Sequence, residues 1–271
     1  LALAEQPEVI LCSYGDMLRV PGSNGRDLLS LRAQGADVRV IYSPLDVLEL
    51  ARSQPKRQVM FFAVGFETTA PATALLAQQA LAEAISNLKL LVAHVRVVPV
   101  LDQLLGDPAC AVQGVLAAGH VCTVMGVEEL QSLVQRHQRP VVITGFSAME
   151  LLTGILQCVR QLERGEERLE NAYTKAVAAE GNQEAQTLLA RVFEPIDTTW
   201  RGLGQIKGGG YRLRPPFDRL EQGSLERSTP CHNTTAEADC PSGLVLQGLM
   251  RPNQCPSYGT LCTPDSPLGA P

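Results

Sequence analysis

Short apolar runs alternate with longer amphipathic segments through the first half of the chain. The runs are nearly continuous, which is typical of strands buried on both faces of a parallel sheet. Helical segments between such strands predict β-α-β units with helices on both sheet faces. The strands expected from this pattern are Val9–Cys12, Val38–Tyr42, Val59–Val64, Leu88–Val92, Val115–Ala118 and Val141–Thr144.

The helices expected between these strands carry recognisable start signals. Ser43 is suited to cap a helix, and Pro44 to occupy its first position, where no amide hydrogen is needed. Thr68 and Thr69 stand at another helix start and favour plain N-capping there, although the free amides of such a terminus can also bind an anion. The predicted helices are Gly25–Gln34, Pro44–Arg52, Thr68–Ser86, Leu101–Leu105 and Val127–Arg136.

The pattern changes after residue 147. Ala148–Glu163 has the apolar period of a long helix, and Glu166–Ala179 and Gln183–Val192 are predicted as two further helices. A glycine-rich stretch over residues 202–210 neither follows a convincing strand nor opens a helix, so we interpret it as turns rather than a phosphate loop. A polar linker, Asp218–Thr229, leads to the C-terminal segment.

The overall composition excludes some classes of partner. Hydrophobic residues make up 45% and charged residues 19% of the chain, as in an ordinary globular protein. The net charge of −5 argues against nucleic-acid binding, which needs a basic face. No apolar stretch reaches the length of a membrane span. We therefore expect neither a nucleic-acid nor a membrane partner.

Four of the eight cysteines gather in the C-terminal segment with the spacing C-x8-C-x14-C-x6-C. This stretch is rich in Pro, Gly and Asn and cannot bury much core, so thiolate binding of a metal or cluster would offset the entropy of ordering it. The other four cysteines are scattered through the α/β pattern, which fits a reducing cytoplasm better than a disulfide framework. The clustered cysteines are Cys231, Cys240, Cys255 and Cys262.

Polar and reactive residues follow three of the predicted strands, where open α/β sheets bind ligands. The first group is as compatible with an ion pair inside a turn as with a site, and the last is more readily two packed side chains at a strand end than a metal site. The groups are Asp16 and Arg19, then Glu67, Thr68 and Thr69, and finally His120 and Cys122.

The motifs, taken in order, resemble the HypD family of hydrogenase maturation proteins. The resemblance rests on C-S-Y-G-D-M-L-R-V-P-G at Cys12–Gly22, Y-S-P-L-D at Tyr42–Asp46 and G-F-E-T-T-A-P at Gly65–Pro71. It continues with G-H-V-C-T-V-M-G at Gly119–Gly126, W-R-G-L-G at Trp200–Gly204 and C-T-P at Cys262–Pro264. These matches span nearly the whole chain.

The resemblance implies a fold of Rossmann-like parallel-sheet domains around a cleft, with a C-terminal helical and cysteine-rich domain that holds a [4Fe–4S] cluster. The polar and reactive groups that follow the three strands would line this cleft, which receives iron, its diatomic ligands or a partner. It divides the chain into a remainder of the first α/β domain (1–55), a second α/β domain (56–147) and an incomplete cluster domain (148–271). It also implies cytoplasmic work with a HypC-like small maturation protein and a cyanide-delivering HypE-like protein. Their joint product would be an iron carrying cyanide and carbon monoxide, so the chain is expected to be an assembly scaffold rather than a self-sufficient enzyme.

The chain also departs from the family pattern. It lacks the family's Cys-Gly-Thr-His motif, whose Cys is expected to hold the iron, and its Gly-Pro-Gly-Cys-Pro-x-Cys motif. Cys240, Cys255 and Cys262 match the first three cluster ligands, whereas the fourth would lie beyond Pro271 and Cys231 is a weaker substitute. The sequence is therefore expected to be incomplete at both ends.

Three other interpretations stay open at this point. The chain could be one piece of a split protein or a non-functional remnant. It could be a zinc-binding α/β module, although zinc sites favour closer Cys-x2–4-Cys pairs. A nucleotide-dependent enzyme is disfavoured, because no Gly-x-Gly-x-x-Gly fingerprint follows a strand.

Overall fold

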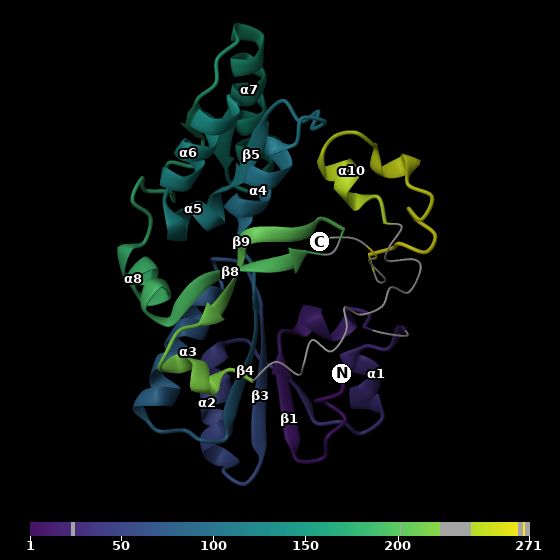
Figure 1. Cartoon of the computed structure of the whole chain (residues 1–271), viewed down its shortest axis with the longest axis vertical. Coiled ribbons are helices and arrows are strands. Elements are labelled where there is room, and N and C mark those ends of the chain that lie inside the picture. Colours follow the sequence, from purple (N-terminus) through teal and green to yellow (C-terminus); the bar gives the residue numbers. More distant parts are fainter. Residues whose placement is uncertain (23–24, 201, 223–239, 265–267, 269–271) are drawn as a thin grey trace.

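The computed structural model describes residues 1–271 except 23–24, 201, 223–239, 265–267 and 269–271. Its described part contains two parallel sheets and one antiparallel hairpin. Figure 1 shows the first sheet with helices α1 to α3 at the bottom, the second sheet with helices α4 to α7 at the top, and the hairpin between them. The α/β class with parallel sheets is thus confirmed.

The first sheet has four strands in the order β2-β1-β3-β4, all parallel. Its strands are β1 (Val9–Ser13), β2 (Val38–Val40), β3 (Gln58–Gly65) and β4 (Leu88–His94), and its helices are α1 (Leu28–Ala33), α2 (Pro44–Ser53) and α3 (Ala70–Ala82). Helix α2 begins as predicted, with Ser43 in a capping box and Pro44 in the first turn. A short 3-10 turn, η1 (Gly15–Arg19), follows β1.

The second sheet has three parallel strands in the order β5-β6-β7. Its strands are β5 (Val115–Ala118), β6 (Val141–Thr144) and β7 (Leu169–Asn171). The surrounding helices are α4 (Val97–Gly106), α5 (Gly119–Met125), α6 (Glu128–His137) and α7 (Ala148–Arg164). All six predicted strands are present, because continuous apolar runs are what strands inside covered parallel sheets require.

The helix predicted over Glu166–Ala179 is wrong. Residues 169–171 instead form β7, which pairs with β6 and completes the second sheet. The side chain of Asn171 then holds the following turn: its carboxamide oxygen accepts from the Tyr173 amide at 2.9 Å, and its nitrogen donates to the Val177 carbonyl at 3.2 Å. Asparagine competes with helical hydrogen bonding in this way, which explains the failure.

The turns predicted over residues 202–210 are also wrong. Strands β8 (Phe193–Trp200) and β9 (Gly204–Leu213) form a long antiparallel hairpin. Glycine is needed where β9 packs closely: a Cβ at Gly210 would lie 3.1 Å from the Thr198 side chain and 3.4 Å from the His94 carbonyl. The hairpin reaches the first sheet, where the Arg96 amide donates to the Gly209 carbonyl at 2.9 Å.

Helix α8 (Gln183–Val192) packs its apolar face into the core of the first sheet. That core also contains Phe61 and Phe193, whereas a separate core around Leu133 and Ile143 lies within the second sheet. The chain therefore leaves the first sheet after β4 and returns to it at α8. The expected domain boundary at residues 55/56 falls between α2 and β3, so both sides of it belong to one sheet.

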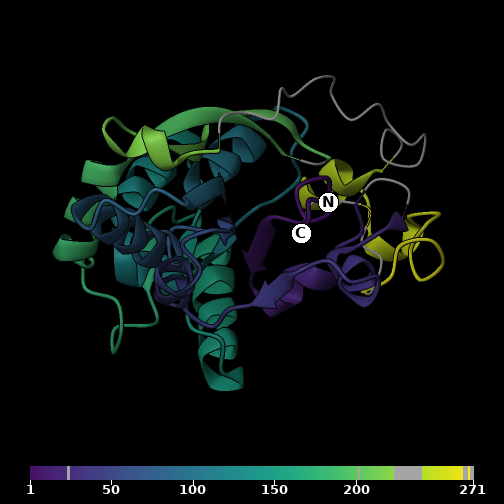
Figure 2. The same cartoon turned by 90° about the horizontal axis from the view of Figure 1, so that it is seen from below.

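The described part of the C-terminal segment contains η3 (Phe217–Leu220), α10 (Ser242–Leu246) and η4 (Pro252–Gln254). No described residue between 240 and 264 is buried. Figures 1 and 2 both show α10 and its neighbours to one side of the molecule, opposite α8. Within the described ranges, no helix is long and apolar enough to cross a membrane.

Candidate functional site

The carboxyl ends of β3 and β5 bring Glu67 and Cys122 to the same small cavity. The cavity has a volume of about 20 Å³, which is room for roughly one water molecule. Glu67 follows β3 of the first sheet, whereas Cys122 lies in α5, directly after β5 of the second sheet. The two sheets therefore meet at their carboxyl edges, where the sequence analysis predicted the candidate site residues.

The Glu67 side chain is 1% exposed, and only one of its two carboxyl oxygens has a hydrogen-bond partner among the described residues. Its Oε1 accepts from the Val97 amide at 2.9 Å, while no described group bonds to its buried Oε2. Burial raises the pKa of Glu67, and the backbone amides and the charge of Arg96 oppose that rise. A carboxyl group in this setting holds a proton more readily than one in water.

Arg96 links the carboxyl edge to the hairpin, and the sequence pattern did not single it out. Its guanidinium donates to the Glu129 carboxylate at 2.6 Å and to the Gly208 carbonyl at 3.2 Å, and its Cζ lies 5.7 Å from the centre of the Tyr211 ring. Its position two residues after the end of β4 was the available signal. The positive charge of Arg96 acts on Glu67 and favours its ionised form.

Cys122 is 3% exposed and lies on the inner face of α5. Burial, with a smaller contribution from the nearby charge of Glu67, raises the pKa of the Cys122 thiol to about 11. Helix α5 can start this close to β6 only because residue 119 is glycine: a Cβ there would lie 2.6 Å from the Thr144 carbonyl oxygen. The thiol is therefore held neutral against the second core.

His120 does not line this cavity. It is exposed and lies beside the ring of Phe146, with 5.0 Å between the ring centres. Partial burial there lowers the pKa of His120. The structure thus separates His120 from Cys122, although only Val121 stands between them in the sequence.

The other predicted residues lie at the same edge but do not enter the cavity. Asp16 and Arg19 are exposed on η1, where Asp16 accepts from the Met17 amide at 2.9 Å, and no described ion pair joins the two. Thr69 occupies the N-cap position of α3, but its hydroxyl donates to the Phe66 carbonyl at 3.1 Å instead of accepting a helix amide. The predicted side-chain cap at this helix is therefore wrong, and Thr68 lies half-buried before it.

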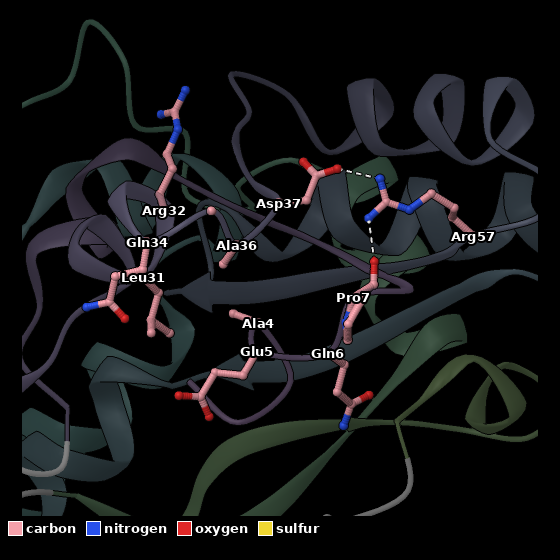
Figure 3. A pocket seen from close by; sticks show the side chains of 11 residues that line it. Ala4, Glu5, Gln6, Pro7, Leu31, Arg32, Gln34, Ala36, Asp37 and Arg57 are labelled. Carbon is pink, nitrogen blue, oxygen red and sulfur yellow. Dashed lines mark hydrogen bonds and ion pairs between the residues drawn. The ribbon is translucent and has the colours of Figure 1, made fainter.

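Two larger hollows flank the first sheet. An apolar one of about 480 Å³ lies beside η1 and the carboxyl halves of β3 and β4, lined among others by Met17, Phe62 and Phe66. A polar one of about 700 Å³ lies at the amino ends of the strands, where Figure 3 shows Arg57 bonded to Asp37 and to the Pro7 carbonyl. The polar hollow is at the opposite strand ends from those where open α/β sheets bind ligands.

The C-terminal cysteines form a different environment. Cys240, Cys255 and Cys262 are half-exposed, and Cys231 lies outside the described residues. Within the described part of the chain, no group of three metal-ligating side chains is close enough to hold a metal ion. Cysteine thiolates are suitable ligands for a metal or a cluster, but the described tail thiols do not lie together in such a group.

These features define an α/β protein whose two parallel sheets meet at their carboxyl edges and which carries a cysteine-rich tail. The HypD family model, described as the hydrogenase formation hypA family, matches residues 1–271. The chain therefore belongs to the HypD family of hydrogenase maturation factors.

Individual relatives agree with this assignment. The chain is 39% identical over 278 residues to the hydrogenase maturation factor HypD of Rhizobium leguminosarum bv. viciae, covering 100% of the chain and 72% of that protein. It is 40% identical over 272 residues to the Escherichia coli K12 factor of the same name, covering 99% and 72%. The hydrogenase expression/formation protein HupD of Azotobacter chroococcum is 40% identical over 279 residues, with 100% and 73% covered.

Proposed function

We propose that this chain is an assembly scaffold for the iron centre of nickel–iron hydrogenases and works with a HypC-like small partner. The product is an iron that carries two cyanide ligands and one carbon monoxide, and a HypE-like protein delivers the cyanide. The observation that carries the proposal is the meeting of Glu67 and Cys122 across two facing sheets, in a chain of the hydrogenase maturation family.

The iron in this proposal is cargo rather than a resident cofactor. Ferrous iron with cyanide and carbonyl ligands accepts soft thiolates as further ligands. Among the described residues, no three metal-ligating side chains lie together. In this proposal the partner supplies the remaining iron ligands, so the chain acts as a shared surface rather than as a self-sufficient enzyme.

The residues at the carboxyl edge then have distinct roles. The cavity has room for about one water molecule, so Cys122 would bind iron only after the two carboxyl edges move apart and its thiol loses its proton. Glu67, with its unbonded Oε2 in the same cavity, is placed to receive that proton. Asp16, Arg19 and His120 are exposed and form the rim that meets the partner. Thr69 fixes the loop that holds Glu67 through its bond to the Phe66 carbonyl, and Thr68 lies half-buried beside it.

The C-terminal cysteines would hold a [4Fe–4S] cluster, which supplies electrons when bound. Cys240, Cys255 and Cys262 are the proposed ligands, with Cys231 as the candidate for a fourth. The Leu268 amide donates to the Cys262 Sγ at 3.5 Å, the kind of contact that tunes cluster sulfurs. Because the thiols do not converge in the described residues, the tail would have to close on binding. All seven described cysteines are free, which suits a reducing cytoplasm.

The cluster assignment is tested by measuring iron, sulfide and zinc after anaerobic expression and iron–sulfide reconstitution, with EPR of the reduced protein. Equal iron and sulfide with a reduced-cubane signal would support it. Cys255→Ser should abolish the signal, whereas Cys110→Ser, in the core, should not. Zinc without sulfide would support the zinc-binding alternative, and a metal-free protein would remove the redox role.

The scaffold role is tested by co-expressing the chain with the HypC-like and HypE-like proteins of its own organism. A purified complex that shows cyanide and carbonyl stretching bands in its infrared spectrum would support the proposal. Cys122→Ser and Glu67→Gln should weaken those bands while leaving complex formation intact. Failure to form any complex would contradict the scaffold role and favour a split or non-functional chain.

A further inference from the structure

Arg96 lies in the connection between β4 and α4 and is held by the hairpin. Its amide donates to the Gly209 carbonyl at 2.9 Å, and its guanidinium donates to the Gly208 carbonyl at 3.2 Å. The same strand, β9, contributes Tyr211 and Leu213 to the core of the first sheet. Arg96 is therefore fixed to the first sheet and its hairpin.

The Arg96 guanidinium also reaches the helices of the second sheet. It donates to the Glu129 carboxylate at 2.6 Å. Glu129 lies in the first turn of α6, whose Leu130 and Leu133 belong to the second core. Among the described residues, this is the one ion pair that joins the first sheet or its hairpin to a helix of the second sheet.

The ion pair is shielded from solvent on its positive side. The Arg96 side chain is 14% exposed and that of Glu129 is 41% exposed. The buried Nε of Arg96 has no partner among the described residues, so the guanidinium depends on Glu129 and Gly208 to compensate its burial. Removing one partner of a buried charge costs more than breaking a surface pair, because the remaining charge stays unpaired. The pair therefore favours the arrangement in which the two sheets are in contact.

A second contact between the two sheets has a different character. The Val124 carbonyl, in α5, accepts from the Asn182 amide at 3.0 Å and from the Gln186 side chain at 2.8 Å. Gly181 packs so closely here that a Cβ would lie 2.3 Å from the Gly126 amide nitrogen. These hydrogen bonds involve no charged side chain. Loss of the ion pair would therefore loosen one part of the sheet contact while this part stays closed.

The ion pair also borders the candidate site. Glu129 lines the cavity of about 20 Å³ that Glu67 and Cys122 share. Cys122 is 3% exposed, so neither a metal ion nor a reagent reaches its thiol while the cavity is closed. We propose that the Arg96–Glu129 pair is a latch: it holds the two carboxyl edges together and must break before Cys122 becomes accessible. Arg96 and Glu129 are thus positioning residues that act on Cys122 through the closed cavity.

This inference rests on the proposed function, in which Cys122 binds iron after the carboxyl edges move apart. Timed iodoacetamide labelling of the metal-free chain without partners tests it, with peptide mass spectrometry giving the rate at each cysteine. Glu129→Gln keeps the shape of the side chain but removes its charge, and it should raise the Cys122 rate by about tenfold or more. Cys12, in the first core, should keep its wild-type rate and so report that the fold is retained.

Arg136→Gln is the matched control. The Arg136 Nε donates to the Asp102 carboxylate at 2.9 Å, which forms an ion pair between α6 and α4 beside the second sheet. Its loss removes a charge from the same helix as Glu129 without changing a contact between the sheets. The Cys122 rate in this variant should stay within about twofold of the wild-type rate.

A double-mutant cycle completes the test. Arg96→Gln should also speed Cys122 labelling, and combining it with Glu129→Gln should add no further increase, because the pair acts as one unit. An unchanged Cys122 rate in Glu129→Gln, increases that multiply in the double variant, or an equal rise at Cys12 would each overturn the proposal. These rates are measured without iron. A latch that behaves as expected in a chain that never shows cyanide or carbonyl bands would therefore contradict the scaffold role alone.

Discussion

The two sheets and the C-terminal tail use the same residue, cysteine, in opposite ways. The four cysteines of the sheets are buried, and burial raises the pKa of Cys12 to about 12 and that of Cys122 to about 11. The described tail cysteines are half-exposed, in a segment without a single buried residue between 240 and 264. Burial therefore keeps the Cys12 and Cys122 thiols protonated and away from solvent, whereas the thiols of the described tail are open to reagents and ligands.

The difference follows from what each region can bury. In the body of the protein, meaning the two sheets and the helices around them, the burial of aromatic and aliphatic side chains in two cores offsets the cost of ordering the backbone. The tail has few contacts of that kind, and its link to the body includes polar ones, such as Gln247 bonded to Asp107 and to the Ala111 amide. A segment with so little apolar burial gains stability mainly from what it binds.

The largest expected contrast is in stability. Phe61 is fully buried, so Phe61→Ala should lower the free energy of unfolding by about 3–5 kcal/mol. Leu244 in the tail is 43% exposed, and Leu244→Ala should change the free energy of unfolding by less than about 0.5 kcal/mol. Urea denaturation followed by circular dichroism measures both. Equal shifts for the two variants would show that the tail belongs to the core.

Acid should destabilise the body through His94. This side chain is 1% exposed, and burial lowers the pKa of His94 from 6.5 to about 4. The unfolded chain then binds a proton that the folded chain refuses, so stability is full above pH 6.5 and is lost as pH falls towards 4. The loss amounts to about 3 kcal/mol. Denaturation curves at several pH values should show this slope in the wild type, and His94→Gln should remove it.

Thiol labelling should separate the two sets of cysteines directly. With pKa values of about 12 and about 11, Cys12 and Cys122 are almost entirely protonated at neutral pH. In the native, metal-free protein, Cys255 and Cys262 should react with iodoacetamide at least about a hundredfold faster. Peptide mass spectrometry after timed quenching gives the rates. The difference in labelling rate should vanish in denaturant. Equal rates for all four cysteines in the native protein would contradict the prediction.

The smallest effect concerns Glu67. Burial raises the pKa of this carboxyl above its usual 4.5, so the folded chain binds a proton that the unfolded chain releases. Its contribution is full below that value and is lost as pH rises through the raised pKa. Glu67→Gln should therefore gain stability relative to the wild type as pH increases. Thermal melts of the wild type and the variant at several pH values from acid to neutral test this direction. The melting temperature of the variant should rise relative to that of the wild type as pH increases, and a relative fall would contradict the prediction.

The sequence predicted the parts of the fold that depend on local patterns. Six of the seven described parallel strands were found because they are continuous apolar runs, whereas the short strand β7 was predicted as helix. Ser43 and Pro44 marked a helix start correctly. Strand β8 was missed because its residues alternate in burial and include Pro195, and β9 because its glycines suggested turns. Glycine there serves close packing against residues distant in the chain, which no local pattern shows.

The candidate site, like the fold, was predicted only where it depends on local sequence patterns. The strand ends that carry Glu67 and Cys122 could be identified, because ligand-type residues follow buried strands. That these two side chains meet, while His120 turns towards Phe146, depends on how one sheet packs on the other. Arg96 was missed for a related reason: its contacts with Gly208 and Tyr211 span more than a hundred residues of chain.

The return of the chain to the first sheet at α8 has a mechanical consequence. The two sheet units are joined by two separate covalent connections, one between β4 and α4 and the other between β7 and α8. Paired connections of this kind permit rotation about the line that joins them and resist twisting and separation. A single proteolytic cut in either connection would therefore leave the halves attached. The nicked protein should elute as one species in size-exclusion chromatography and come apart only in denaturant.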